Sequence, residues 1–194
     1  FSFPNRVSRF AEIEFTVEDL SADEVEVCLP AWRPGRYELG DFAKNIRKWK
    51  AFDKEGHPLP FKKVAKDKWL VSMNGSSVLK VRYDYYCSKP DAGACWVDEQ
   101  LVYVNPVHCC LFIPERMNEP CSVQLDLPSD HQVACSMQPT GKHSFKASNY
   151  HELVDSPWMA AAELHHGEYE VQGTRCHIWF HGNLDPDWPK PTSD

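Results

Sequence analysis

Short segments of alternating apolar and polar residues run through much of the chain. The first places Ile13, Phe15 and Val17 on one face of a strand and Glu12 and Glu14 on the other, which is the pattern of a half-buried strand. Similar segments lie at residues 25–29, 79–85 and 123–127, shorter ones at 69–72, 100–104, 109–113 and 132–136, and a longer one at 169–181. Turn residues separate these segments. About ten such strands predict a mainly all-β fold, a two-layer antiparallel β-sandwich.

Helical spacing is found only at Leu39, Phe42, Ala43 and Ile46, so we expect at most one or two short helical turns. The 194 residues, 42% of them apolar, suffice for one ordinary core. Residues 1–182 are therefore predicted to form one β-sandwich domain. Residues 183–194 contain three prolines among polar residues, which is the composition of a linker and predicts a further domain beyond it.

Charge and hydrophobicity exclude two classes of partner. The 28 acidic and 21 basic residues give a net charge of −7, which the phosphates of nucleic acids would repel. No apolar run approaches the roughly 20 residues of a membrane-spanning helix, so no membrane partner is expected.

Eight cysteines without a C-x-x-C pair favour reduced, mostly buried thiols and a cytoplasmic location. Cys87 and Cys95 are nevertheless spaced to close one loop, and a periplasmic or secreted location stays open.

The most suggestive catalytic pattern begins at His151-Glu152, because zinc peptidases carry His-Glu-x-x-His on one helix. Here Asp155 stands in place of the second histidine, and Pro157 would end the helix. The segment therefore predicts no zinc site.

Other histidines offer no better set of ligands. His177 and His181 are four residues apart, but in a strand their Cβ atoms would be about 13 Å apart. The pair His165-His166 precedes a glycine and is predicted to lie in a surface loop. Because no three ligands have a workable spacing, we expect no catalytic residue, no metal site and no cofactor in this chain.

The most distinctive motif lies between residues 30 and 46. Pro34-Gly35 predicts a tight turn, with Trp32 and Tyr37 placed to cover it. We interpret the motif as a structural corner built from Trp32, Pro34, Gly35, Tyr37, Asp41 and Asn45. A buried Trp32 would then contribute about 3–5 kcal/mol to stability.

This motif also resembles a signature of the glycyl aminopeptidase family, peptidase family sixty-one, which are zinc metallopeptidases of the gluzincin clan. Residues 32–37 match W-x-P-G-x-Y and residues 41–46 match D-[FY]-[AS]-[RK]-N-[IV]. Further matches follow in order: A-x-D-x-x-G at 51–56, K-x-x-W at 66–69, V-x-Y-x-[VY]-[YF] at 81–86 and L-[VA]-D-S-P at 153–157. The resemblance extends from about residue 7 to residue 182 and departs from the family pattern after Pro157 and in the cysteine-rich middle.

The resemblance implies the N-terminal β domain of a larger enzyme. The family's His-Glu-x-x-His helix and its zinc would then belong to a catalytic domain beyond residue 194, which would be the partner of this domain. Two functions stay open: a non-catalytic domain that packs on the catalytic domain and shapes the peptide cleft, or a free-standing sandwich that binds carbohydrate or protein through exposed aromatic residues.

A fainter similarity to the N-terminal domain of the aminopeptidase N family concerns residues 100–120. There, a strand holds the substrate's α-ammonium group, and matching the Ile113-Pro114 step places Asn105 at that position. Tyr103 points to the same face of the strand and would line the cleft. The alternatives are a simple Asn105-Pro106 turn and a core position for Tyr103.

Overall fold

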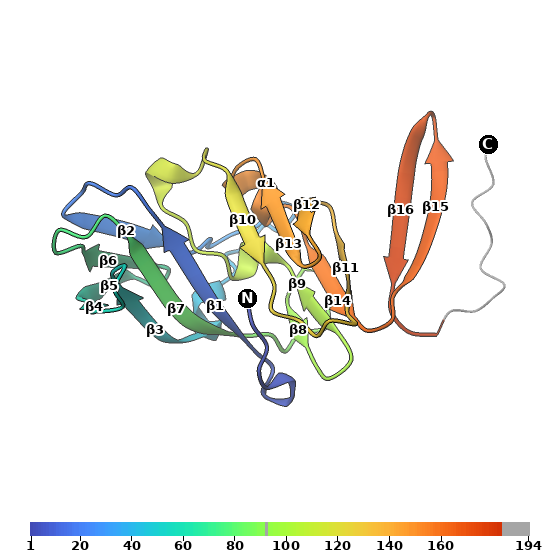
Figure 1. Cartoon of the computed structure of the whole chain (residues 1–194), viewed down its shortest axis with the longest axis horizontal. Coiled ribbons are helices and arrows are strands. Elements are labelled where there is room, and N and C mark those ends of the chain that lie inside the picture. Colours follow the sequence, from blue (N-terminus) through green and yellow to red (C-terminus); the bar gives the residue numbers. More distant parts are fainter. Residues whose placement is uncertain (92, 184–194) are drawn as a thin grey trace.

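Antiparallel strands dominate residues 1–91 and 93–183, which are the residues described by the computed structural model (Figure 1). The predicted mainly-β, sandwich-like architecture is confirmed, but the strands and the sheets are more numerous than predicted. The described residues form sixteen strands in five sheets, where the sequence pattern predicts about ten strands in two sheets. Several of the additional strands are only two to four residues long, too short for an alternation to be recognised.

Two sheets form the N-terminal half of the molecule. The first has the strand order β1 (Phe10–Val17), β7 (Leu79–Tyr86), β3 (Ile46–Phe52) and β4 (Pro58–Leu59). The second has the order β2 (Glu24–Cys28), β6 (Lys68–Ser72) and β5 (Phe61–Ala65). Trp49 of β3 stacks on Trp69 of β6, with ring centroids 5.3 Å apart. This pair joins the facing sides of the two sheets, as in a sandwich.

Two further sheets form the C-terminal half. The first has the order β11 (Gln132–Cys135), β14 (Trp158–Ala161), β9 (Val102–Val104) and β8 (Trp96–Val97). The second has the order β10 (Cys121–Gln124), β13 (Ser144–Ala147) and β12 (Gln138–Gly141).

One hydrophobic core runs through both halves. Trp158 of β14 is only 2% exposed, and the rings of Phe1 and Phe3 pack edge-on against it at 5.8 and 6.0 Å. The backbones of Cys28 and Phe112 also pair between the halves. The amino-terminal residues therefore help to close the C-terminal sheets.

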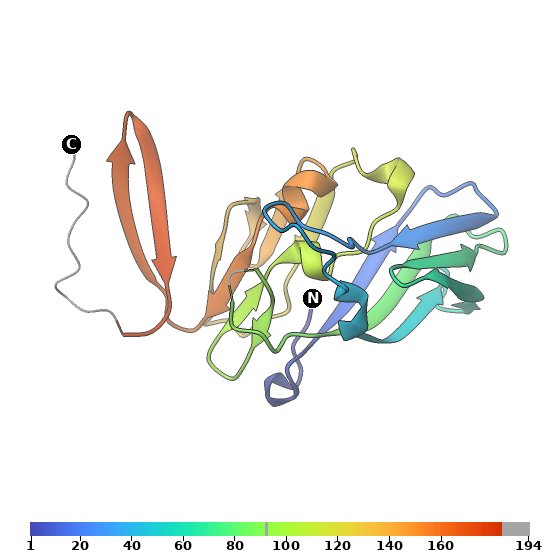
Figure 2. The ribbon, with the colours of Figure 1, turned by 180° about the vertical axis from the view of Figure 1, so that it is seen from behind.

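A two-stranded hairpin stands apart from these sheets in both views (Figures 1 and 2). It consists of β15 (His165–Val171) and β16 (Thr174–Phe180), joined by a two-residue turn. Gln172 and Gly173 have φ values of 48° and 78°, as a type I′ hairpin turn requires. This corrects the prediction of one long strand after residue 169, and it places His165 and His166 in a strand instead of a loop.

The helical segments are short but more numerous than predicted. They are the 3-10 helices η1 (Arg6–Ser8), η2 (Phe42–Asn45), η3 (Pro106–His108) and η4 (Pro114–Arg116) and the α-helix α1 (Tyr150–Val154). Proline begins η3 and η4, where its missing N–H is not needed. No helix among the described residues is long and apolar enough to cross a membrane.

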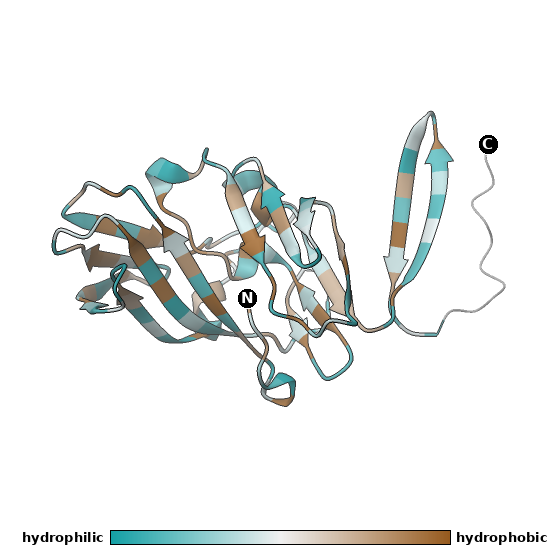
Figure 3. Ribbon diagram, in the orientation of Figure 1, coloured by the Kyte–Doolittle hydropathy of each residue, from teal (hydrophilic) through white to brown (hydrophobic). Residues whose placement is uncertain are grey.

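Hydrophobic and hydrophilic residues alternate along β1 and β7 (Figure 3), which pair over their whole length, and burial follows the predicted alternation. Asp84 is the exception, since it is buried on the face expected to be solvated. Its carboxylate lies 2.8 Å from Arg47 Nε and 3.0 Å from Lys48 Nζ. A bulge in β3, at which Lys48 has a φ of 54°, accompanies this convergence of two cations on one carboxylate.

The predicted linker begins at Asn183, and its remaining residues, 184–194, lie outside the described part of the chain.

Candidate functional site

The loop between β2 and η2 carries the distinctive motif and forms the predicted turn. The N–H of Arg36 donates to the carbonyl of Arg33 at 3.3 Å, and Gly35 has a φ of 80°. Proline and then glycine occupy the two central positions of this type II turn, which requires a positive φ at the second. We refer to residues 30–41 as the signature loop.

The aromatic residues of the signature loop are not buried, contrary to the corner model. Trp32 is 48% exposed, Tyr37 is fully exposed, and Leu39 is 75% exposed. The loop passes over the outside of the domain before it enters η2 (Figure 2). The indole N–H of Trp32 donates to the carbonyl of Arg36 within the same loop. The Trp32 ring is therefore supported by the loop's own backbone, and both aromatic rings present apolar surface to solvent.

The chain returns to the core directly after the signature loop. Phe42 is buried in η2, and Asn45 donates a hydrogen bond from Nδ2 to the Tyr85 hydroxyl at 3.1 Å. Asp41 lies at the surface, 3.5 Å from Lys66 Nζ. Asn45 thus anchors the end of the motif to β7, whereas Asp41 forms only an exposed ion pair of small energetic value.

A polar cleft of about 240 Å³ lies between the signature loop and the segment that follows β7. Its charged lining residues are Arg36, Lys44, Lys89, Glu38, Asp41 and Asp91. Cations and anions are equal in number, so the cleft has no strong preference for one sign of charge.

His108 is the most unusual residue of this cleft. It is only 6% exposed, its ring centroid lies 4.0 Å from that of Phe42, and its Nε2 is a buried nitrogen with no hydrogen-bond partner in the part of the chain that the structure describes. Burial lowers the pKa of His108 below its ordinary value, and the positive charge of Arg33 acts in the same direction. A neutral imidazole at the base of a polar cleft can donate or accept a hydrogen bond.

A larger and more open groove of about 1200 Å³ lies along β1 and β7. Phe15 and Phe112 contribute apolar surface, and Glu14 and Arg82 form an exposed ion pair across the two strands. Its residue types do not suggest a particular reaction.

Comparison with known protein families gives a match over residues 1–162 to the peptidase M61 N-terminal domain. The chain belongs to this family. The resemblance expected from the motifs is thereby confirmed.

Among solved structures, the M61 domain is similar to an aminopeptidase N family protein from Idiomarina loihiensis, with 25% sequence identity and a TM-score of 0.82. The likeness covers 93% of this chain and 31% of that protein, so the chain spans less than a third of its length. No curated protein matches the chain.

The two substrate-contact candidates of the M61 domain lie on β9 and directly after it. Asn105 is buried at the start of η3, and the thiol of Cys95 lies 3.6 Å from its carbonyl oxygen. Tyr103 is half-buried and pairs with Trp96 and Met159. Neither residue lines the cleft or the groove described above. The burial of Asn105 favours the turn role, and its contact with substrate stays a prediction.

The His151-Glu152 segment of the domain does not fit the zinc centre of a metallopeptidase. Its helix, α1, has five residues and ends at Val154, before Asp155 and Pro157. The Glu152 carboxylate accepts a hydrogen bond from the backbone N–H of Ser148 at 2.6 Å. Glu152 therefore fixes the chain at the start of a short helix, which is a structural role.

Two groups of metal-ligand side chains do come together among the described residues: His166, Glu168 and His177, and Asp53, Glu55 and His57. This corrects the expectation from sequence spacing that no three ligands meet. Spacing along one strand misses contacts between strands. The Gln172-Gly173 turn is the sequence feature from which the first group could have been predicted, because a two-residue hairpin turn defines which residues of the two strands face each other.

Proposed function

We propose that this domain is the non-catalytic N-terminal part of a glycyl-aminopeptidase-like zinc metallopeptidase. It packs on the catalytic domain of that enzyme and helps to shape the cleft that receives peptide substrates. The zinc of the reaction belongs, in this proposal, to the catalytic domain. The observation that carries the proposal is the exposed apolar surface of the signature loop on a domain of peptidase family M61.

The exposed residues of the signature loop are suited to an interface. Trp32, Tyr37 and Leu39 present three large apolar side chains within eight residues of one loop. Isolated apolar residues are common on protein surfaces, but tryptophan and tyrosine beside arginine are the residues that contribute most to binding. Arg36 lies between the aromatic residues and is exposed as well. A partner surface would bury the aromatic rings and still leave the neighbouring polar cleft open to solvent.

The catalytic domain of the same protein is the best-supported partner. The family match identifies an N-terminal domain, and the similar aminopeptidase N family protein is more than three times longer than the matched region. The net charge of −7 disfavours nucleic acid and anionic membrane surfaces as partners. All eight cysteines are unpaired, which supports a cytoplasmic location for the enzyme.

A free-standing binding module is less well supported. That hypothesis needs a platform of exposed aromatic residues, but Trp49, Trp69 and Trp158 are buried in the core. Among the described residues, only the signature loop offers exposed tryptophan and tyrosine together.

The test uses the full-length protein and the variant Tyr37→Ser. If the loop docks on the catalytic domain, we expect kcat/KM for peptides with a free amino terminus to fall about tenfold or more, which corresponds to at least about 1.4 kcal/mol. Thermal unfolding should then separate into two transitions, because the two domains lose their coupling.

Val7→Ser is the matched control, since Val7 is an exposed apolar residue of η1 outside the signature loop. It should leave both measurements unchanged. Wild-type kinetics and a single transition in Tyr37→Ser would contradict docking through this loop. Specific binding of carbohydrate or protein by the 194-residue chain alone would support the binding-module hypothesis instead.

A further inference from the structure

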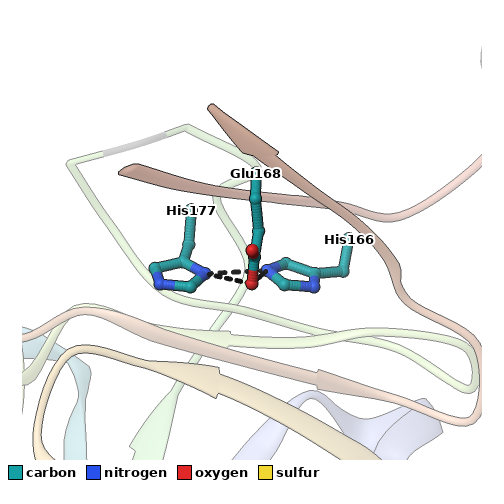
Figure 4. Close-up of side chains that lie close together, drawn as sticks. All are labelled: His166, Glu168 and His177. Atoms are coloured by element: carbon teal, nitrogen blue, oxygen red, sulfur yellow. Dashed lines mark hydrogen bonds and ion pairs between the residues drawn. The ribbon is translucent and has the colours of Figure 1, made fainter. Parts of the chain in front are cut away.

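The β15–β16 hairpin carries three metal-ligand side chains on one face. Glu168 and His177 are direct partners across the two strands, and His166 precedes Glu168 by two residues. Alternation along a strand places such residues on the same side. The two imidazole rings and the carboxylate converge from both strands (Figure 4).

The distances between the ligand atoms fit one small ion. His166 Nε2 lies 3.0 Å from His177 Nδ1, His177 Nδ1 lies 3.3 Å from Glu168 Oε1, and His166 Nε2 lies 3.9 Å from Glu168 Oε1. Tetrahedral zinc with bonds of about 2.0–2.2 Å separates its ligand atoms by about 3.3–3.5 Å. Shifts of a few tenths of an ångström would therefore bring the three atoms to the corners of one coordination face.

Neighbouring aromatic residues support the arrangement. The His166 ring stacks on Trp179 with centroids 4.1 Å apart, and Trp179 in turn packs against a small apolar cluster at Ala134, Ala161 and Leu164. The side chains of the three ligands are between 31% and 48% exposed. His166 is thus backed by a tryptophan that packs on the body of the domain, and the site remains accessible to an ion from solvent.

We propose that His166, Glu168 and His177 bind one divalent transition-metal ion. Zinc is the metal used to test the proposal. The fourth coordination position would be open to water. Two imidazole nitrogens and one carboxylate suit zinc and its neighbours in the first transition row, whereas magnesium and calcium prefer oxygen ligands. Binding requires both facing nitrogens to be unprotonated, so the hydrogen between them moves to the other nitrogen of its ring or to water.

The ion would fasten an element that has little other support. An isolated two-stranded hairpin is marginally stable in water, and both faces of this one are largely exposed. Ligands on β15 and β16 would join the two strands through the metal. Binding should therefore slow the opening of the hairpin without any change in the main sheets.

The experiment titrates zinc into the chelator-treated 194-residue chain and measures heat of binding and bound metal. We expect about one zinc per chain, with affinity at least tenfold lower in His177→Ala and in Glu168→Gln. Cobalt in place of zinc should give the visible absorption of a four-coordinate site in the wild type and lose it in both variants.

Two controls locate the ion. His165→Ala removes a histidine that stacks on Phe180 and lies on the opposite face of β15, so binding should be unchanged. His57→Ala disrupts the second group of ligands, Asp53, Glu55 and His57, and should also leave binding unchanged. Loss of binding in His57→Ala with full binding in His177→Ala would move the ion to that turn and overturn the proposal.

Amide hydrogen exchange provides a readout that does not depend on affinity. Zinc should increase the protection of residues 165–180 several-fold in the wild type and in His165→Ala, and should have no such effect in Glu168→Gln, which keeps the size of the side chain. The proposal fails if wild-type protein binds no more zinc than His177→Ala, or if bound zinc leaves the exchange of the hairpin unchanged.

Discussion

Trp158 and Trp32 have the same side chain in opposite environments. Trp158 is 2% exposed and contacts Phe1 and Phe3, whereas Trp32 is 48% exposed and touches its own loop. We therefore expect Trp158→Ala to lower the free energy of unfolding by about 3–5 kcal/mol and Trp32→Ala to lower it by about 1 kcal/mol. Urea denaturation of the 194-residue chain measures both. A Trp32→Ala loss as large as that of Trp158→Ala would restore the buried-corner model.

At the scale of the element, α1 illustrates how a five-residue helix is held in place. Asn149 accepts a hydrogen bond from the N–H of Glu152, and the Glu152 carboxylate accepts from the N–H and hydroxyl of Ser148. This reciprocal arrangement resembles a capping box. The hydrogen bonds from the Ser148 hydroxyl and N–H lower the pKa of Glu152 below its ordinary value.

The cap predicts a dependence of stability on pH. A carboxylate whose pKa is lowered by folding stabilises the protein above its unfolded pKa, and this contribution is lost as pH falls through the folded value. Glu152→Gln should therefore be less stable than the wild type at pH 7, and the difference should shrink as pH falls to 3. Melting temperatures of both proteins across this range test the prediction. A difference independent of pH would mean that the charge of Glu152 has no part in capping.

The two halves of the molecule share one hydrophobic core, whereas the β15–β16 hairpin packs through Trp179 against a separate small cluster at Ala134, Ala161 and Leu164. We expect β1, β7 and β14 to exchange their amide hydrogens together, at the free energy of global unfolding. The amides of β15 and β16 should exchange at least tenfold faster in the absence of metal. Hydrogen exchange followed by mass spectrometry resolves the two groups. Uniform protection of the hairpin and the core would show that they form one cooperative unit.

The sequence by itself determined the mainly-β class, the turn at Pro34-Gly35 and the family. Each depends on local chemistry. Alternation indicates that one face of a strand is solvated, proline fixes φ, and glycine permits the positive φ of the turn. The family motifs are read directly along the sequence. It did not reveal that β15 and β16 form a hairpin, although the Gln172-Gly173 turn was visible in it.

Only the tertiary structure decided which residues meet and which are covered. The burial of Asp84 depends on a bulge in a strand more than thirty residues away, and the exposure of Trp32 and Tyr37 depends on the path of their loop over the sheets. The meeting of His166 and His177 depends on strand register. Burial and register are properties of contacts between distant segments, and a pattern along one segment carries no information about them.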